Sequence, residues 1–251
     1  MTLLGELVGR ALARRGWDLV KRDEHAQADM EAEFLELHAR CAPFTMTSIE
    51  RMYALYLGVK HLVRAEVPGD VVECGVWRGG SSMLAALTLD ALGDRERSIY
   101  LYDTFAGMTE PDERDRSDHH ESASSAWEQH QAGEINEWCY SPLEEVRENM
   151  LSTGFPAERL HFVPGKVEDT LPGTVPERIS LLRLDTDWYA STYHELKHLF
   201  PLLSPGGVLI LDDYGYWTGS REATDDFMAE TGTEILLNRI DLAGRIGIRT
   251  S

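Results

Sequence analysis

The sequence has few basic residues and few cysteines, and each shortage excludes a class of protein. Lysine and arginine total 24 against 43 aspartates and glutamates, which gives a formal net charge of −19. A surface this acidic repels nucleic-acid backbones and anionic lipid headgroups, so we expect neither nucleic acid nor a membrane as a partner. The three cysteines cannot all pair and form no CxxC motif, which argues against a disulfide framework or a zinc ribbon.

Long apolar runs are also missing. No stretch of about 18 apolar residues occurs, so we expect no helix that spans a bilayer. The N-terminal region lacks the charged, apolar and cleavage-site segments of a signal peptide. Hydrophobic residues nevertheless make up 43% of the 251 residues, enough for one large α/β domain with or without a helical appendage. The simplest interpretation is an ordered cytoplasmic protein.

Two parts of the chain differ in their apolar periodicity. Residues 1–65 follow helical spacing without a strand pattern, so we expect a helical cap there. In residues 66–251, short apolar strands alternate with amphipathic helices, which is typical of a doubly wound, mostly parallel sheet. No helix separates the last two strands, so we expect one of them to be antiparallel. The expected strands cover residues 67–76, 98–103, 159–165, 179–185, 206–214, 233–240 and 244–250.

A long acidic insertion, residues 104–141, lies between the second expected strand and the next helix. Its central part, residues 110–137, contains nine acidic residues and only two arginines. Loops of this length in compact domains are either functional lids or flexible segments. Trp127 and Trp138 favour a lid that orders over substrate. His119 and His120 are candidates within it for a catalytic base or for metal ligands, although a solvated position in the loop is the more ordinary role for a histidine there.

Acidic residues end four of the expected strands, at the edge where open α/β sheets bind ligands. Glu73 begins the turn ECGVWRGG, whose Gly75 and Gly79 let a ligand approach the backbone where a helix starts. The spacing is not the GxGxxG of dinucleotide-binding proteins, and a carboxylate there suits an ammonium group such as that of S-adenosylmethionine (SAM). Asp103 lies 23 residues after Gly80, close to the separation expected for a carboxylate that binds ribose hydroxyls.

The other two strand ends carry two aspartates each. Asp185 and Asp187 follow one strand, and Asp212 and Asp213 follow the next. Neighbouring strands lie about 4.8 Å apart, so the four carboxylates would repel one another unless protons or a cation neutralise them. Because carboxylate oxygens favour a hard divalent ion, we expect Mg²⁺ or Ca²⁺ rather than zinc.

One motif competes with this interpretation. Residues 194–198 read HELKH and match HExxH, the helix motif of zinc proteases. The helix belongs to a strand–helix–strand crossover, and we expect Leu196, Leu199 and Phe200 to face the sheet. No third ligand follows at a known spacing. The sequence therefore favours a packing role for this helix.

Four segments together, ECGVWRGGSS, DTFAG, LRLDTD and LILDDY, resemble the macrocin O-methyltransferase (TylF-type) family. Members of that family use SAM to methylate sugar hydroxyls of macrolide and aminocoumarin antibiotics. The resemblance covers roughly residues 42–225. It implies the class I methyltransferase fold, a Rossmann-like sheet of seven strands with an N-terminal helical cap. It also implies that Thr45 and Met46 close over the cofactor and that Val167 and Glu168 border its adenine.

The resemblance also assigns roles to the acidic strand ends. Asp185, Asp212 and Asp213 match the family's Mg²⁺ ligands, and Asp187 matches a carboxylate proposed as the base in relatives. The residues that match the rest of the SAM site are Glu73, Gly75 and Gly79 at the methionine part and Asp103 at the ribose.

These assignments predict a metal-dependent enzyme that methylates a sugar hydroxyl of a glycosylated metabolite, as a homodimer or higher homo-oligomer. A metal-dependent O-methyltransferase for catechols or phenols is the alternative among enzymes. A SAM-binding protein without turnover is the alternative outside them, although SAM binding alone needs no carboxylate cluster. The missing GxGxxG disfavours a NAD-dependent oxidoreductase.

Overall fold

The structure is a computed structural model that describes residues 27, 29–119 and 122–250. From Glu33 onward the chain forms one compact unit around a seven-stranded sheet in the order β5-β2-β1-β6-β7-β9-β8. The parallel strands are β1 (Asp70–Cys74), β2 (Ile99–Asp103), β5 (Leu160–Pro164), β6 (Ile179–Leu184) and β7 (Leu203–Leu211). The strand β9 (Arg245–Ile248) runs antiparallel to β7, which confirms the expectation for the closing pair.

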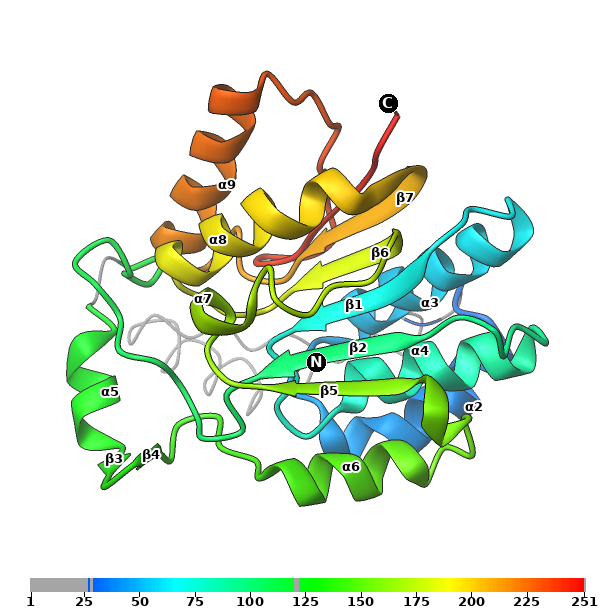
Figure 1. Ribbon diagram of the computed structural model, residues 1–251, viewed down its shortest axis with the longest axis horizontal. Helices are drawn as coiled ribbons and strands as arrows, with labels where there is room; N and C mark the ends of the chain where they lie inside the picture. Colours follow the sequence, from blue (N-terminus) through cyan, green and yellow to red (C-terminus); the bar gives the residue numbers. More distant parts are fainter. Residues whose placement is uncertain (1–26, 28, 120–121, 251) are drawn as a thin grey trace, which may run out of the picture. The chain divides into compact units, whose positions relative to one another are not determined.

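Helices cover both faces of the sheet (Figure 1). One layer contains α2 (Ala32–Cys41), α3 (Ile49–Arg64), α4 (Gly80–Ala91) and α6 (Leu143–Leu151). The other contains α7 (Val167–Thr170), α8 (Tyr189–Leu199) and α9 (Thr218–Thr231). Three short 3₁₀ helices cover Ala42–Phe44, Ala157–Arg159 and Phe200–Leu202. Parallel strands covered on both faces explain why the strand sequences are mostly apolar.

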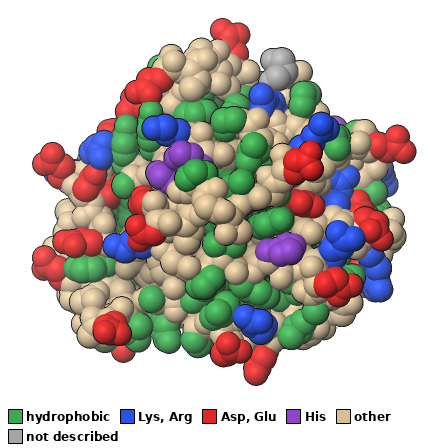
Figure 2. Space-filling model, viewed as in Figure 1, with side chains coloured by type: hydrophobic (Ala, Val, Ile, Leu, Met, Phe, Trp, Pro, Cys, Tyr) green, Lys and Arg blue, Asp and Glu red, His purple; other side chains and the backbone are tan. Residues whose placement is uncertain are grey.

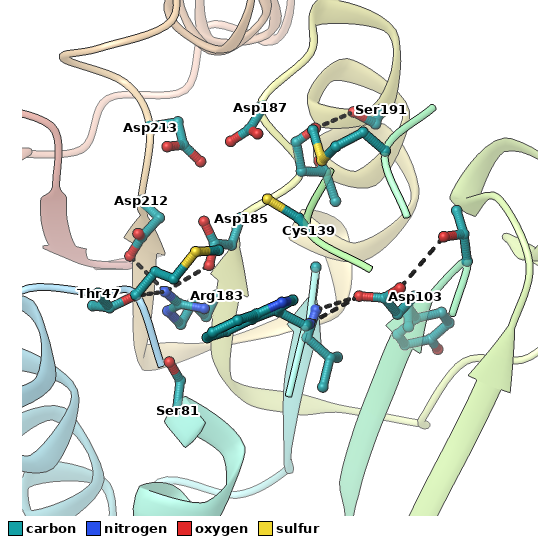
Figure 3. Close-up of a pocket in the computed structure, with 18 of the residues that line it drawn as sticks. Thr47, Ser81, Asp103, Cys139, Arg183, Asp185, Asp187, Ser191, Asp212 and Asp213 are labelled. Atoms are coloured by element: carbon teal, nitrogen blue, oxygen red, sulfur yellow. Dashed lines mark hydrogen bonds and ion pairs between the residues drawn. The ribbon is translucent and has the colours of Figure 1, made fainter. Parts of the chain in front are cut away.

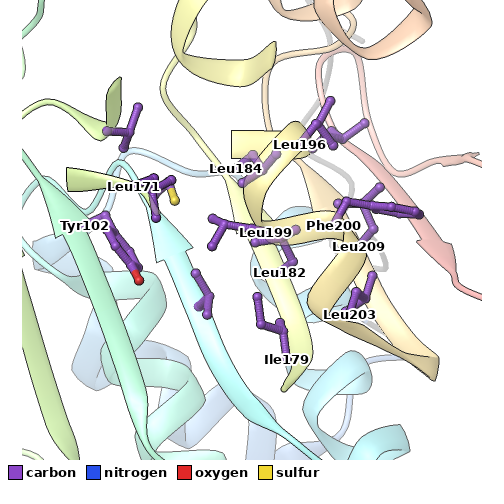
Figure 4. Packing of buried hydrophobic residues seen from close by; sticks show 14 of the residues in the cluster. Tyr102, Leu171, Ile179, Leu182, Leu184, Leu196, Leu199, Phe200, Leu203 and Leu209 are labelled. Carbon is purple, nitrogen blue, oxygen red and sulfur yellow. The ribbon is translucent and has the colours of Figure 1, made fainter. Parts of the chain in front are cut away.

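The helix with the HExxH motif packs as a crossover helix. Leu196, Leu199 and Phe200 are buried and lie over the sheet, against residues such as Leu182 and Leu209 (Figure 4). Each such side chain contributes about 1.5–3 kcal/mol through burial. Within the described part of the chain, the His, Cys, Asp and Glu side chains that could hold a metal do not include those of this motif. The packing role expected for this helix is confirmed.

The N-terminal helices that the structure describes belong to the same unit as the sheet. α3 packs on α4 and against β6 and β7, and α2 contacts α3 through the rings of Phe34 and Tyr53. The first helix expected in the cap, around Leu3 to Leu12, lies outside the described residues. Among the helices described, none combines the length and the apolar character needed to cross a membrane.

The closing strand pair is shorter than expected. A strand was expected over residues 233–240, but β8 covers only Asn238–Arg239 and pairs with β9 alone. Leu236 is 78% exposed, whereas Ile235 and Leu237 pack against the buried core, so side chains hold this segment although it lies outside the strand pairing. The apolar residues of this segment therefore predicted a longer strand than the one that forms at the edge of the sheet.

The acidic insertion is folded and lies beyond the carboxyl ends of the parallel strands (Figure 1). It contains α5 (Ser124–Gln129) and a small antiparallel pair, β3 (Gln131–Ala132) with β4 (Ile135–Asn136). The face of the molecule in Figure 2 shows acidic side chains scattered among basic and apolar ones rather than gathered in one patch. On this face the acidic side chains are thus spread out, whereas four of them gather at the strand ends described next.

Candidate active site

A cavity of about 530 Å³ lies at the carboxyl ends of β1, β2, β6 and β7. One end is formed by the glycine turn, residues 75–80, together with Asp103 and the segment 165–168. The other end is formed by the acidic cluster, which comprises Asp185, Asp187, Asp212 and Asp213. The cavity therefore joins the two groups of residues that the sequence singled out.

Asp103 holds the glycine turn in shape. Its carboxylate accepts the backbone N–H groups of Val76 at 2.7 Å, Trp77 at 3.1 Å and Phe105 at 2.7 Å. Burial raises the pKa of Asp103, while these three hydrogen bonds act in the opposite direction. Asp103 lines the cavity (Figure 3), and its contact with a ribose stays a prediction.

Gly75 brings the glycine turn against the acidic cluster. Its φ is +81°, and a Cβ at this position would lie 1.9 Å from the carbonyl oxygen of Asp185. A side chain at residue 75 would push the two ends of the cavity apart. The glycine is therefore required by a close backbone approach between two strand ends.

Glu73 and Gly79 are not placed as the sequence suggested. Glu73 is 3% exposed and does not line the cavity, because its carboxylate pairs with Arg183 and accepts the hydroxyl of Ser82. Burial raises the pKa of Glu73, and the nearby Arg183 guanidinium opposes this shift. Gly79 precedes α4 with its α-carbon toward Val146 of α6 rather than toward the cavity. Glu73 thus compensates a buried arginine and does not face a ligand's ammonium group.

The other predicted cofactor residues do line the cavity. They are Thr45, Met46, Gly75, Val167 and Glu168. The neighbouring Thr47 accepts a hydrogen bond from Arg183 at 3.0 Å, which fixes the loop before α3 to the sheet. The loop residues and the segment after β5 therefore form opposite parts of the same wall.

Three carboxylates of the acidic cluster point toward one another (Figure 3). Oxygen atoms of Asp185, Asp187 and Asp213 lie within 4.8 Å of one another. Burial is the largest cause that raises the pKa of all three, and it brings that of Asp187 to about 7. Asp213 Oδ2 is buried and has no hydrogen-bond partner among the described residues. Such a donor set fits a hard divalent cation with oxygen ligands, in agreement with Mg²⁺ or Ca²⁺.

Asp212 differs from the predicted metal set, because two arginines hold it. Arg51 of α3 pairs with its Oδ2, and Arg183 Nη2 lies 2.7 Å from its Oδ1. Arg51 also contacts Asp241 at 3.0 Å. Asp187, which was predicted as the base, takes the place of Asp212 beside Asp185. Arg183 Nη2 also lies 2.8 Å from Asp185 Oδ2, so the difference arises from Arg51, which pairs with Asp212 and not with Asp185 among the ion pairs of the described residues.

Sequence reasoning missed these two arginines. Arg183 is a lone charge inside the apolar strand ISLLRL and is 3% exposed. A buried charge requires partners of opposite charge, so an arginine inside an apolar strand indicates a buried ion-pair network. Arg51 gave no such signal, because a charged residue on an amphipathic helix is ordinary.

The histidines proposed as bases fare differently from Asp187. The His119 side chain is 83% exposed and does not line the cavity, and its nearest acidic group is Asp118 at 3.8 Å. A solvated loop position explains this, since the ring is held by no group that lines the cavity among the described residues. His120 lies outside the described residues. Asp187 lines the cavity and remains the candidate base.

The insertion supplies a wall of the cavity. Met108, Thr109 and Trp138 line it together with Trp217. Two indole N–H groups fix this wall to the backbone: Trp127 donates to Met108 O at 3.0 Å, and Trp188 donates to Thr109 O at 2.9 Å. The insertion thus contributes aromatic surface next to the acidic cluster, where an acceptor molecule would lie.

The profile of the Macrocin-O-methyltransferase (TylF) family matches residues 18–246. The chain belongs to this family. A similar protein is the 8-demethyl-8-(2,3-dimethoxy-alpha-L-rhamnosyl)-tetracenomycin-C 4'-O-methyltransferase of Streptomyces olivaceus, 38% identical over 80% of this chain and 73% of its own length. The mycinamicin III 3''-O-methyltransferase of Micromonospora griseorubida is 35% identical over 80% of this chain and 76% of its own length.

Solved structures agree with this placement. The O-methyltransferase NovP is 29% identical, with a TM-score of 0.74 over 99% of both chains. The calicheamicin methyltransferase CalS11 has a TM-score of 0.61 at 18% identity, over 92% of this chain and 98% of its own, and shows the fold alone. The chain therefore has the class I SAM-dependent methyltransferase fold expected from the sequence, and as a member of the TylF family it is an O-methyltransferase.

Proposed function

We propose that the protein transfers the methyl group of SAM to a hydroxyl of a sugar carried by a small natural product, with a divalent cation at the acidic cluster. The observation that carries the proposal is the single cavity in which a glycine turn held by Asp103 meets three facing carboxylates. The named relatives act on glycosylated tetracenomycin and on mycinamicin, which supports a sugar as the acceptor.

The residues at the two ends of the cavity divide the work. Asp103 and the backbone of the glycine turn bind and orient SAM, with Val167 and Glu168 along its adenine. Asp187 offers one oxygen to the cation and takes the proton of the acceptor hydroxyl on its other oxygen. The aromatic wall of Trp138 and Trp217 excludes water from the reacting atoms. Since methyl transfer needs little covalent help from the protein, alignment of the two substrates supplies most of the rate.

The acidic cluster would hold the cation through Asp185, Asp187 and Asp213. A bound divalent cation lowers the pKa of a coordinated hydroxyl, which a weakly acidic sugar alcohol requires. Arg183 and Arg51 balance the remaining charge by holding Asp212. The predicted role of Asp212 as a ligand would need Arg51 to turn toward Asp241, which already contacts it.

Calorimetry and a methyl-transfer assay test this proposal. We expect SAM to bind with and without Mg²⁺, and turnover on a panel of glycosylated metabolites to stop when EDTA is added. Asp185→Asn should abolish metal-dependent turnover and leave SAM affinity nearly unchanged. Asp225→Asn is a matched control, because Asp225 accepts the hydroxyl of Tyr214 and neither residue lines the cavity. Loss of SAM binding in Asp185→Asn would contradict the assignment of SAM to one end of the cavity and of the cation to the other.

The acceptor class needs a separate comparison. Methylation of a catechol, with no methylation of any glycosylated compound, would favour the alternative of a catechol-type enzyme. SAM binding without turnover on either class would favour a binding protein. The predicted homo-oligomer is part of the proposal and is checked by the mass of the protein in solution.

A further inference from the structure

Asp115 of the insertion is a buried carboxylate outside the cavity. The residue is 1% exposed and does not line the cavity. Its Oδ1 accepts the N–H of Tyr189, the first residue of α8, at 2.9 Å. Its Oδ2 accepts the N–H of Asp112 at 2.7 Å. A carboxylate is costly to bury unless it is bonded, so the use of both oxygens indicates a fixed position.

The same carboxylate packs against the start of α9. A Cβ at Gly219 would lie 1.9 Å from Asp115 Oδ1, so this contact requires glycine. Beside it, Thr218 donates its N–H to Arg116 O at 2.9 Å and accepts the N–H of Arg116 on its hydroxyl at 3.1 Å. One segment of the insertion therefore fastens the first turns of both α8 and α9.

These two helices begin where the loops of the acidic cluster end. α8 follows Asp187, whose backbone has a φ of +68°, and α9 follows the loop that starts at Asp213. Between Asp187 and Tyr189, Trp188 is also held by its bond to Thr109 O. A shift of either first turn would change the separation of Asp187 and Asp213, and with it the fit of a cation between them.

We infer that Asp115 is a positioning residue for the cation end of the site, which it serves by holding the loops of Asp187 and Asp213 at a fixed separation. The inference rests on the proposed function, because it assigns a partner to the acidic cluster. It gives the insertion a second role besides forming the acceptor wall. Asp115 acts from outside the cavity, as second-neighbour groups of metal ligands do.

The test measures Mn²⁺ affinity of the full-length protein by electron paramagnetic resonance, without acceptor. Asp115→Ala should weaken Mn²⁺ binding by roughly tenfold, the scale on which partners of metal ligands act. SAM affinity by calorimetry should stay unchanged. In assays, kcat should fall at low Mn²⁺ and recover at saturating Mn²⁺, which a general loss of folded protein would not produce.

Two further variants keep the test decisive if Asp115→Ala is unstable. Asp115→Asn retains an oxygen for the N–H of Tyr189 and should retain more Mn²⁺ affinity than the alanine variant. Gly219→Ala should also weaken Mn²⁺ binding, because a methyl group at the start of α9 would displace the Asp115 carboxylate. Asp112→Ala is the control, because its side chain pairs with the exposed Arg114 alone.

The outcomes separate this inference from the proposed function. If the wild-type protein binds Mn²⁺ and both Asp115→Ala and Gly219→Ala bind it equally well, the inference is overturned and the cation site stands. If the wild-type protein binds no Mn²⁺, the cation site and the inference fall together. Equal weakening in Asp112→Ala would also overturn the inference, since it would trace the effect to the insertion as a whole.

Discussion

The two ends of the cavity are built in different ways. The end proposed to bind SAM is shaped by backbone hydrogen bonds, in which Asp103 binds the turn that follows the neighbouring strand. The acidic end is assembled from distant segments, as in the pair of Arg51 with Asp212, which are 161 residues apart. The first depends on backbone shape and the second on a balance of buried charges. Substitutions should therefore affect them separately, except where they touch.

Gly75 is the point of contact between the ends, and its substitution should have the largest effect. A Cβ there would meet the carbonyl oxygen of Asp185 at 1.9 Å in addition to the strain of a positive φ. We expect Gly75→Ala to lower the free energy of unfolding by about 3 kcal/mol or more and to abolish SAM binding. Thermal unfolding and calorimetry measure both.

Gly93→Ala is the matched control for this prediction. Gly93 has a similar φ of +78°, but nothing lies within 4 Å of a Cβ there. Its substitution should cost only the conformational strain, about 1 kcal/mol. Equal effects of the two substitutions would mean that the contact with Asp185 is unimportant.

Asp103 should separate the two ends. Asp103→Asn removes the charge that three backbone N–H groups share and leaves the acidic cluster untouched. A charge-assisted hydrogen bond contributes roughly 1.5–3 kcal/mol, so SAM affinity should fall by about 10- to 100-fold. Mn²⁺ binding, measured in the same samples, should not change. A parallel loss of Mn²⁺ affinity would contradict the independence of the two ends.

Glu195 tests how a buried carboxyl near the acidic cluster affects the stability of the fold. It is 0% exposed, its Oε2 accepts the Thr186 hydroxyl at 3.1 Å, and its Oε1 has no partner among the described residues. Burial raises its pKa well above the ordinary value. The folded protein therefore holds this proton more tightly than the unfolded chain, and the carboxyl destabilises the fold increasingly as pH rises above the unfolded pKa near 4.3.

Glu195→Gln should therefore stabilise the protein at neutral pH. The amide removes the buried charge and keeps an oxygen for Thr186, so we expect a gain of about 1–3 kcal/mol at pH 7 that shrinks toward pH 4. Denaturant unfolding over this range measures it. Glu222→Gln, at an exposed position on α9, should change stability at neither pH. A loss of stability in Glu195→Gln would show that the ionised form has a partner.

Both ends of the cavity could be predicted from sequence in part. Asp103 and Gly75 lie at the ends of strands with clear apolar patterns, so the spacing along the chain located them. The four aspartates were found for the same reason. The sequence did not indicate which of these aspartates face one another, because this depends on Arg51 and Arg183 from other parts of the fold.

Other differences from the sequence-based predictions have the same origin. Glu73 occupies a strand end like Asp103, yet its side chain meets Arg183 and Ser82 rather than the cavity. The alternation of side chains along β1 does not reveal what the neighbouring strand places opposite. His119 belongs to an acidic loop, where a solvated histidine is the ordinary case, and its exposure agrees with that alternative.

The smallest effect concerns the mouth of the cavity. Met46, Tyr216 and Leu242 are among the exposed large apolar residues of the described chain, and all three line the cavity. Exposed apolar side chains grouped at one opening indicate contact with an apolar ligand surface. In the proposed function that surface is the part of the acceptor that carries the sugar. Leu242→Ser should therefore raise the acceptor KM about fivefold, equivalent to about 1 kcal/mol, without changing SAM affinity.

Leu236→Ser provides the comparison that makes this effect interpretable. Leu236 is 78% exposed, against 57% for Leu242, but it lies outside the cavity lining. Its substitution should leave both KM values unchanged, because loss of an apolar side chain facing water costs little. If both variants raise the acceptor KM equally, the closing strands respond as a unit and the mouth has no selective role. If neither does, the acceptor is held by the acidic end and the aromatic wall alone, which would place all of its recognition deep in the cavity.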